Sequence, residues 1–102
     1  MAAVVQDNPD QHRYEVYDDG ELAGFASYQR SEGRITLTHT EVDDRFEGRG
    51  LGSALARGVL DEARRDDLAV LPYCPFIAGY IRGHADEYVD LVPGDQRAKF
   101  GL

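Results

Sequence analysis

The amino-acid sequence predicts an α+β (α/β) fold, in which a mostly antiparallel sheet contains one parallel pair of strands and carries two main helices. Two observations lead to this prediction. Up to residue 42, apolar and polar residues alternate in short segments separated by turn residues, which is typical of consecutive strands. From residue 50, apolar residues recur with the period of a helix, and a short apolar segment and a second helical segment follow.

Three strands are expected before residue 43, and they form an antiparallel meander. Residues 13–19 alternate between two faces, and Asp19-Gly20 is a strong signal for a two-residue hairpin turn. Residues 22–30 form the returning strand. After a second turn, residues 35–42 carry β-branched side chains at alternate positions, which favours a third strand.

Two helices and one further strand are expected after this meander. Residues 50–66 form the first helix, and residues 68–73, "LAVLPY", form a short buried strand. Because a strand–helix–strand unit returns the chain in the same direction, this strand pairs in parallel with residues 35–42. Residues 75–84 form the second helix, since Pro75 suits a first helical position. The apolar stripe of the first helix consists of Leu51, Leu55, Val59, Leu60 and Ala63.

The chain of 102 residues is expected to form one domain, with its core in residues 13–92 and polar tails at 1–11 and 93–102. Its net charge of −8 argues against nucleic-acid binding, which requires a basic face. The charge mildly favours a cationic or amine substrate, but a solvated acidic surface that keeps the protein soluble is the preferred explanation. The absence of an apolar leader or membrane span, with a single cysteine, predicts a cytoplasmic protein.

Three glycines at alternate positions precede the first helix, in "FEGRGLGSAL" at 46–55. The first N–H groups of a helix lack partners and carry partial positive charge, and glycine allows an anion to approach them. A strand, this loop and a helix therefore predict a phosphate cradle. The spacing differs from the dinucleotide fingerprint, and the single lysine, Lys99, is not placed as in a P-loop. The alternative is that the glycines serve only tight turns and packing.

Three longer stretches resemble a short subgroup of the GNAT acetyltransferases. They are "DGELAGFASY" at 19–28, "LTHTEVDDRFEGRGLGSAL" at 37–55 and "CPFIAGYIRGHADEYVDLV" at 74–92. The last stretch departs from the subgroup at "HADEY", where the subgroup commonly has His-Pro-Glu-Tyr. The resemblance implies a minimal GNAT fold, in which the two parallel strands splay apart and the pantetheine arm of acetyl-CoA lies in the opening.

The resemblance also implies a set of cofactor-binding residues. "EGRGLG" at 47–52 resembles the family's acetyl-CoA loop, Q/R-x-x-G-x-G/A, with a departure at Glu47. The backbone of Glu41 and Val42 would hydrogen-bond the pantetheine amides. For Arg49, a phosphate contact and a solvated side chain both remain open. The implied diphosphate-binding residues are Glu47, Gly48, Arg49, Gly50, Leu51, Gly52 and Ser53.

Cys74 and Tyr80 are the first candidates for the chemistry of acetyl transfer. Cys74 precedes the second helix, whose N-terminus stabilises a thiolate, and it would accept the acetyl group. The alternative is a small buried side chain. Tyr80 follows six residues later, where a tyrosine protonates the leaving thiolate in many larger GNATs. The alternative for Tyr80 is a tyrosine of the core.

His39 and Glu41 are candidate bases on the strand 35–42. Both share the strand phase of Ile35 and Leu37, so they are expected to point to the same face. A structural histidine is the alternative for His39. His84 is a further candidate, placed to reach the cofactor from the end of the second helix. The positions of His39, His84 and Cys74 do not have the spacing of metal ligands, which argues against a metal site.

The sequence therefore predicts an acetyl-CoA-dependent N-acetyltransferase that acts on a primary amine, as a monomer or homodimer. The alternative is a non-catalytic module that binds acyl-CoA or a protein partner. This alternative arises because the sequence lacks the N-terminal helices and last strands that shape the acceptor pocket in larger GNATs.

Overall fold

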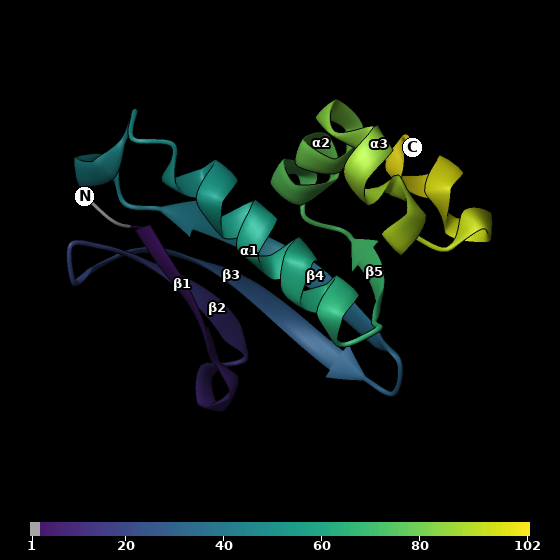
Figure 1. Cartoon of the computed structure of the whole chain (residues 1–102), viewed down its shortest axis with the longest axis horizontal. Coiled ribbons are helices and arrows are strands. Elements are labelled where there is room, and N and C mark those ends of the chain that lie inside the picture. The colour runs from purple at the N-terminus through teal and green to yellow at the C-terminus, as the bar shows by residue number, and fades with distance from the viewer. Residues whose placement is uncertain (1–2) are drawn as a thin grey trace.

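A computed structural model describes residues 3–102, and it contains a five-stranded sheet in the order β1-β2-β3-β4-β5. Helix α1 crosses one face of the sheet, and α2, α3 and the C-terminal segment gather near β5 (Figure 1). This mixed architecture confirms the predicted fold class. The elements are β1 (Ala3–Asn8), β2 (Arg13–Asp18), β3 (Glu21–Ser31), β4 (Arg34–Val42), α1 (Leu51–Arg65), β5 (Ala69–Pro72), α2 (Pro75–Gly83) and α3 (Ala85–Tyr88).

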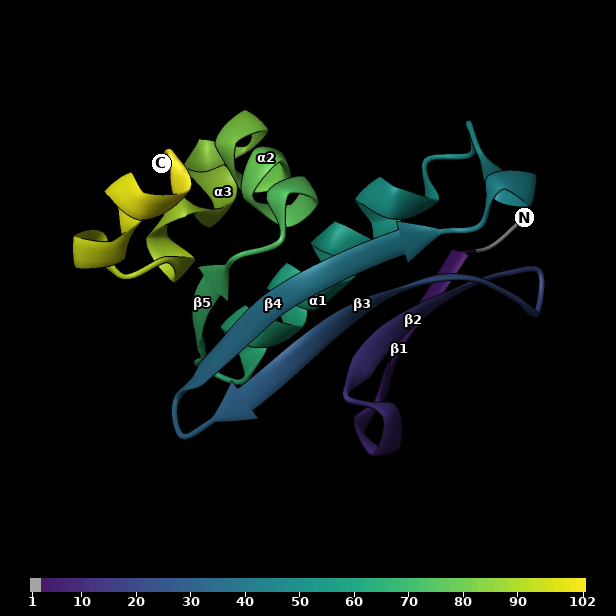
Figure 2. The ribbon, with the colours of Figure 1, turned by 180° about the vertical axis from the view of Figure 1, so that it is seen from behind.

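The strand pairings follow the predicted meander and strand–helix–strand unit. Strands β1 to β4 pair in antiparallel fashion, and β4 pairs with β5 in parallel. Asp19 and Gly20 both have positive φ, at 50° and 86°, as the tightest hairpin turns require. Seen from behind, β3 and β4 lie in front of α1, so that in residues 3–102 the opposite face of the sheet is free of helices (Figure 2).

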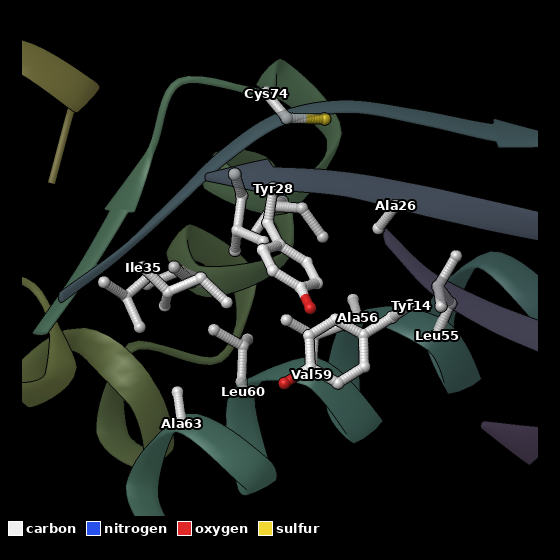
Figure 3. Packing of buried hydrophobic residues seen from close by; sticks show 14 of the residues in the cluster. Tyr14, Ala26, Tyr28, Ile35, Leu55, Ala56, Val59, Leu60, Ala63 and Cys74 are labelled. Carbon is white, nitrogen blue, oxygen red and sulfur yellow. The ribbon is translucent and has the colours of Figure 1, made fainter. Parts of the chain in front are cut away.

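The main core lies between α1 and the sheet. The predicted apolar stripe of α1 is buried, and Leu55, Val59 and Leu60 are each 0% exposed. Tyr14 and Tyr28 reach from the sheet toward α1, with ring centroids 5.1 Å apart (Figure 3). Their hydroxyls donate hydrogen bonds to Glu62 and Asp7, and burial raises the pKa of both phenols.

β1 corrects the prediction that residues 1–11 form a polar tail. Residues 3–8 pair along the whole of β2, and Val5 packs against α1 where Gly58 leaves room. A Cβ at Gly58 would lie 2.9 Å from the Val5 side chain. The strand escaped prediction because Val4 and Val5 are adjacent and polar residues follow, so that no alternation marks it.

The C-terminus requires a similar correction. Residues 93–102 were expected to form a polar tail, but Gly94–Phe100 form a 3₁₀ helix. Phe100 is 8% exposed and packs edge-on against Tyr73, with ring centroids 5.0 Å apart. Helix α2 ends at Gly83, and His84 separates it from the short helix α3, so the predicted helix over 75–84 is nearly correct.

Glu15 is buried on the outer face of the sheet, opposite α1. It accepts hydrogen bonds from Tyr17 at 2.7 Å, from Arg13 at 2.8 Å and from Asn8 at 3.1 Å. The Tyr17 hydrogen bond is the main cause that lowers the pKa of this carboxyl, and the Arg13 and Asn8 bonds add to it. A lowered pKa in the folded state means that the ionised group stabilises the fold above its unfolded pKa, and this is lost as the pH falls through the folded pKa.

Replacing Glu15 by glutamine is therefore expected to lower the melting temperature at neutral pH, and the difference from wild type should shrink as the pH is lowered through the acidic range. Thermal denaturation followed by circular dichroism between neutral pH and pH ~3 measures this. The control is Glu32→Gln at an exposed position of the β3–β4 turn. A melting difference for Glu15→Gln that is independent of pH would contradict the expected role of the charge.

Candidate active site

A fork opens where β4 and β5 separate. Their pairing runs from Arg34 and Ala69 to Leu37 and Pro72. The last backbone hydrogen bond between the two arms is donated by the N–H of Cys74 to the carbonyl of Leu37, at 2.8 Å. Beyond it the chain turns into α2, while β4 continues to Val42 (Figure 1). Among residues 3–102, the end of β4 thus has no strand partner on this side, as expected for a splayed parallel pair.

Cys74 lies inside the fork. It is 3% exposed and occupies the residue before α2. Its Sγ lies 3.2 Å from Oγ1 of Thr40 on β4, so this hydrogen bond connects the two arms of the fork. Figure 3 shows the sulfur above the core, at its upper edge. The thiol is therefore both held in place and shielded from water.

The glycine loop lies at the N-terminus of α1. Gly50 caps the helix with a φ of 73°, and Gly48 has a φ of 83°. The N–H of Ala54 donates to the Gly50 carbonyl at 3.0 Å, so the N–H groups of residues 51–53 precede the helical hydrogen bonds. Among the described residues, no side chain caps these groups. The loop and Phe76 of α2 line a cleft of about 250 Å³.

The glycines of this loop serve different purposes. A Cβ added to Gly48 or Gly50 would meet nothing within 4 Å, so their positive φ requires glycine, not close packing. A Cβ on Gly52 would lie 2.9 Å from the ring of Phe76. Of these three glycines, only Gly52 is explained by packing against α2. The space beside the backbone of Gly48 and Gly50 is empty.

For Arg49 the phosphate contact stays a prediction, and the structure adds an ion pair that the sequence did not indicate. The Arg49 guanidinium donates to Oδ2 of Asp18 at 2.6 Å, at the end of β2. The side chain of Arg49 remains half-exposed, at 50%, while that of Asp18 is 1% exposed. The sequence does not indicate a role for Asp18, because a contact between residues 31 positions apart leaves no local pattern.

A β-bulge in β4 corrects the predicted orientation of His39 and Glu41. Leu37 pairs with Tyr28 and His39 with Ser27, so Thr38 is an extra residue. The bulge reverses the alternation, and His39 and Glu41 lie exposed on the face opposite α1. There, Nε2 of His39 lies 2.8 Å from a carboxylate oxygen of Glu41.

The same bulge turns Thr40 toward the buried side of the strand, where it meets Cys74. Sequence reasoning missed Thr40 because Ile35, Leu37, His39 and Glu41 continue the alternation without an interruption. The candidate bases His39 and Glu41 therefore lie on one side of β4, and the candidate nucleophile Cys74 lies on the other.

Tyr80 lies at the junction of α1, α2 and α3. Its ring stacks on His84, with centroids 4.1 Å apart, and the guanidinium of Arg57 lies 6.0 Å from its centroid. Nδ1 of His84 lies 2.9 Å from the carbonyl oxygen of Tyr80. Within residues 3–102, no hydrogen bond joins Tyr80 to Cys74. Phe76 and Tyr80 are four residues apart on α2, so they share the face that meets α1.

Tyr88 completes this junction from α3. Its hydroxyl donates to Asp61 at 2.7 Å and accepts from Arg57 at 3.1 Å. Burial, with the nearby Asp61 carboxylate, raises the pKa of Tyr88 to about 12. The junction is therefore a fixed polar network that holds α3 against α1.

Comparison with known proteins identifies the family. A family model described as GCN5-related N-acetyl-transferase matches residues 13–91, which is most of the chain. The chain belongs to this family, and membership supports a function of the N-acetyltransferase type. The predicted resemblance to the GNAT acetyltransferases is thus confirmed, while the assignment to the short subgroup rests on its motifs and stays a prediction.

Individual relatives agree with this assignment. Protein NATD1 of Xenopus tropicalis and of Homo sapiens are each 38% identical to this chain over 48 residues. The matched segment is 47% of this chain and 44% and 42% of those proteins, so it spans less than half the length of these curated relatives.

Two solved structures share the fold. A GCN5-like protein from Staphylococcus aureus, determined by NMR, superposes with a TM-score of 0.63 at 24% identity, covering 89% of this chain and 88% of that one. A ribosomal-protein-alanine N-acetyltransferase from Brucella melitensis biovar Abortus 2308 superposes with a TM-score of 0.52 at 17% identity, covering 80% and 62%.

None of the helices over residues 3–102 combines the length and apolar character needed to cross a membrane.

Proposed function

We propose that the protein binds acetyl-CoA in the fork and transfers its acetyl group to a primary amine. The observation that carries this proposal is the continuity between the fork and the glycine loop. The unpaired end of β4 leads from Thr40, beside Cys74, to Val42, which lines the same cleft as the loop. The unpaired backbone of Glu41 and Val42 would hydrogen-bond the pantetheine amides, as an added strand does.

The glycine loop would hold the diphosphate. The N–H groups of Leu51, Gly52 and Ser53 precede the first helical hydrogen bond, and the positive end of the α1 dipole favours an anion there. Glu47, Gly48, Arg49 and Gly50 supply the rest of the cradle. The open space beside Gly48 and Gly50 supports this assignment, because an anion can approach the bare backbone.

Cys74 would take the acetyl group before the amine does. Its sulfur would bond to the acetyl carbon, the coenzyme sulfur would leave, and the proton of Cys74 would pass to the departing thiolate. The amine would then attack the acetyl-cysteine, lose a proton, and restore the thiol. When bound, acetyl-CoA supplies an activated thioester. When the Cys74 sulfur carries negative charge, the hydroxyl of Thr40 can donate a hydrogen bond to it.

Direct transfer without the cysteine is the second route, and it assigns roles to the remaining candidates. His39 and Glu41 lie on the exposed face of β4, where they would accept a proton from an amine that approaches from water. Tyr80, whose ring stacks on His84, would donate its hydroxyl proton to the leaving thiolate.

A non-catalytic acyl-CoA-binding module is the alternative function, and one observation favours it. Cys74 is 3% exposed, and Phe76 lines the cleft beside Gly52. An acetyl group therefore reaches the sulfur only if the side chains that cover it move. The cytoplasmic location, the single-domain organisation and the monomeric or homodimeric state remain predictions beside this proposal.

Isothermal titration with acetyl-CoA tests the binding step, and mass spectrometry after incubation with acetyl-CoA tests the chemistry. We expect saturable binding and a gain of one acetyl group on Cys74. Cys74→Ala should keep the binding and lose the modification, because alanine fits the buried position without the nucleophile. Binding without acetylation of Cys74 or of any offered amine would support the non-catalytic module. The absence of binding by the folded protein would contradict both functions.

A further inference from the structure

Asp18 is a buried carboxylate in a position that the fold alone does not explain. It ends β2 and is 1% exposed. Its Oδ2 accepts the hydrogen bond from Arg49, and its Oδ1, within the described part of the chain, has no partner. Burying a charged group is costly unless it is paired, and the pairing here goes to the glycine loop.

Arg49 stands between the two glycines with positive φ, Gly48 and Gly50. Glycine has the greatest backbone freedom of any residue, so this segment is the part of the loop that would be hardest to hold in one conformation. Among residues 3–102, the Arg49–Asp18 ion pair is the only side-chain hydrogen bond made by residues 47–53. The Arg49 guanidinium also lies 5.4 Å from the ring centroid of Phe46, which is buried.

We propose that Asp18 is a positioning residue for the diphosphate-binding loop and acts through Arg49. The inference rests on the proposed function, because it assigns Asp18 a part in acetyl-CoA binding. By holding Arg49, Asp18 keeps the loop in its binding conformation before the coenzyme arrives. Preorganisation of this kind strengthens binding because the loop does not have to be ordered on association.

The charge of Asp18 has an opposing effect on acetyl-CoA binding. Asp18 also neutralises Arg49, so its removal makes the loop more positive and more attractive to a diphosphate. Arg49 is half-exposed, and water and salt screen this gain. The loss of order at two flexible glycines is not screened. The net expectation for removing the carboxylate is therefore weaker binding.

Asp18→Asn tests the inference, with Asp19→Asn as the matched control. Both variants remove one negative charge, at adjacent positions, but Asp19 is exposed and its positive φ suits asparagine. Titration calorimetry is expected to show acetyl-CoA binding weakened about tenfold by Asp18→Asn and changed less than about twofold by Asp19→Asn. Wild-type or tighter binding by folded Asp18→Asn would overturn the inference.

A second variant tests whether Asp18 acts through Arg49. Asp18→Asn combined with Arg49→Gln removes both charges of the ion pair, so its net charge equals that of wild type. This double variant is expected to bind no more tightly than Asp18→Asn, because the loop has lost its anchor in both. Recovery of wild-type affinity in the double variant would contradict the role of Arg49 as the connecting residue.

A measurement without ligand separates this inference from the proposed function. In ¹⁵N-edited NMR spectra of the free protein, the amide signals of Gly48 and Gly50 are expected to shift or broaden in Asp18→Asn and to stay unchanged in Asp19→Asn. Unchanged loop signals would overturn the positioning role, even if wild type binds acetyl-CoA. Conversely, changed loop signals in a protein that binds no acetyl-CoA would support the positioning role and refute the proposed function.

Discussion

Replacing Gly50 by glutamate is expected to abolish acetyl-CoA binding without unfolding the protein. Gly50 has a φ of 73°, and the space beside it is open, so the new side chain would project into the proposed cradle. Its carboxylate would repel the diphosphate at the place where the N–H groups of α1 should meet it. The affinity measured by calorimetry should fall by at least about 100-fold. The strain of a left-handed conformation at a non-glycine residue lowers the free energy of unfolding by only ~1 kcal/mol.

Gly33→Glu is the matched control for this prediction. Gly33 has a φ of 76° and open space beside it, but it lies in the turn between β3 and β4. It therefore suffers the same backbone strain and the same change of charge. We expect this variant to bind acetyl-CoA as wild type does. Equal affinities for the two glutamate variants would refute the assignment of the loop.

Gly24→Ala is expected to be the most destabilising small substitution in the sheet. An added Cβ would collide with the backbone carbonyl of Glu41 and lie 3.1 Å from Cα of Val42. Both obstacles are backbone, so no side-chain rotation relieves them. Overpacking of this kind costs about 2 kcal/mol, which lowers the melting temperature by roughly 10 °C in a chain of this size.

The added Cβ would push away Glu41 and Val42, and these are the residues of β4 that are proposed to bind the pantetheine arm. Gly24→Ala should therefore weaken acetyl-CoA binding at temperatures where the variant is fully folded. Gly79→Ala is the control, because it lies inside α2 and an added Cβ would meet only Arg82, at 3.9 Å. It is expected to raise stability by about 0.5–1 kcal/mol. A Gly24→Ala variant as stable as wild type would show that β3 and β4 separate easily here.

Much of the fold was predictable because local patterns determine it. The hairpin at Asp19-Gly20 depends on two residues with positive φ, and the stripe from Leu51 to Ala63 has the period of a helix. The parallel pair followed from the order of strand, helix and strand. The glycine loop was recognisable because its unusual residues stand next to each other in the sequence.

The remaining features depend on contacts between distant residues. β1 is defined by its pairing with β2 and by the room at Gly58, and Phe100 is buried by Tyr73. The ion pair of Asp18 and Arg49 likewise joins two separate elements. In each case the local sequence is compatible with an exposed segment, and only the folded chain supplies the partner.

The bulge at Thr38 has a consequence for how two reactants would meet. One extra residue reverses the alternation of side chains along β4, so that Thr40 points to the helix side of the strand and its neighbour Glu41 points to water. A coenzyme seated along the inner side and an amine received on the outer side would use separate entrances. Neither molecule would then block the other's path, and their order of arrival would be free.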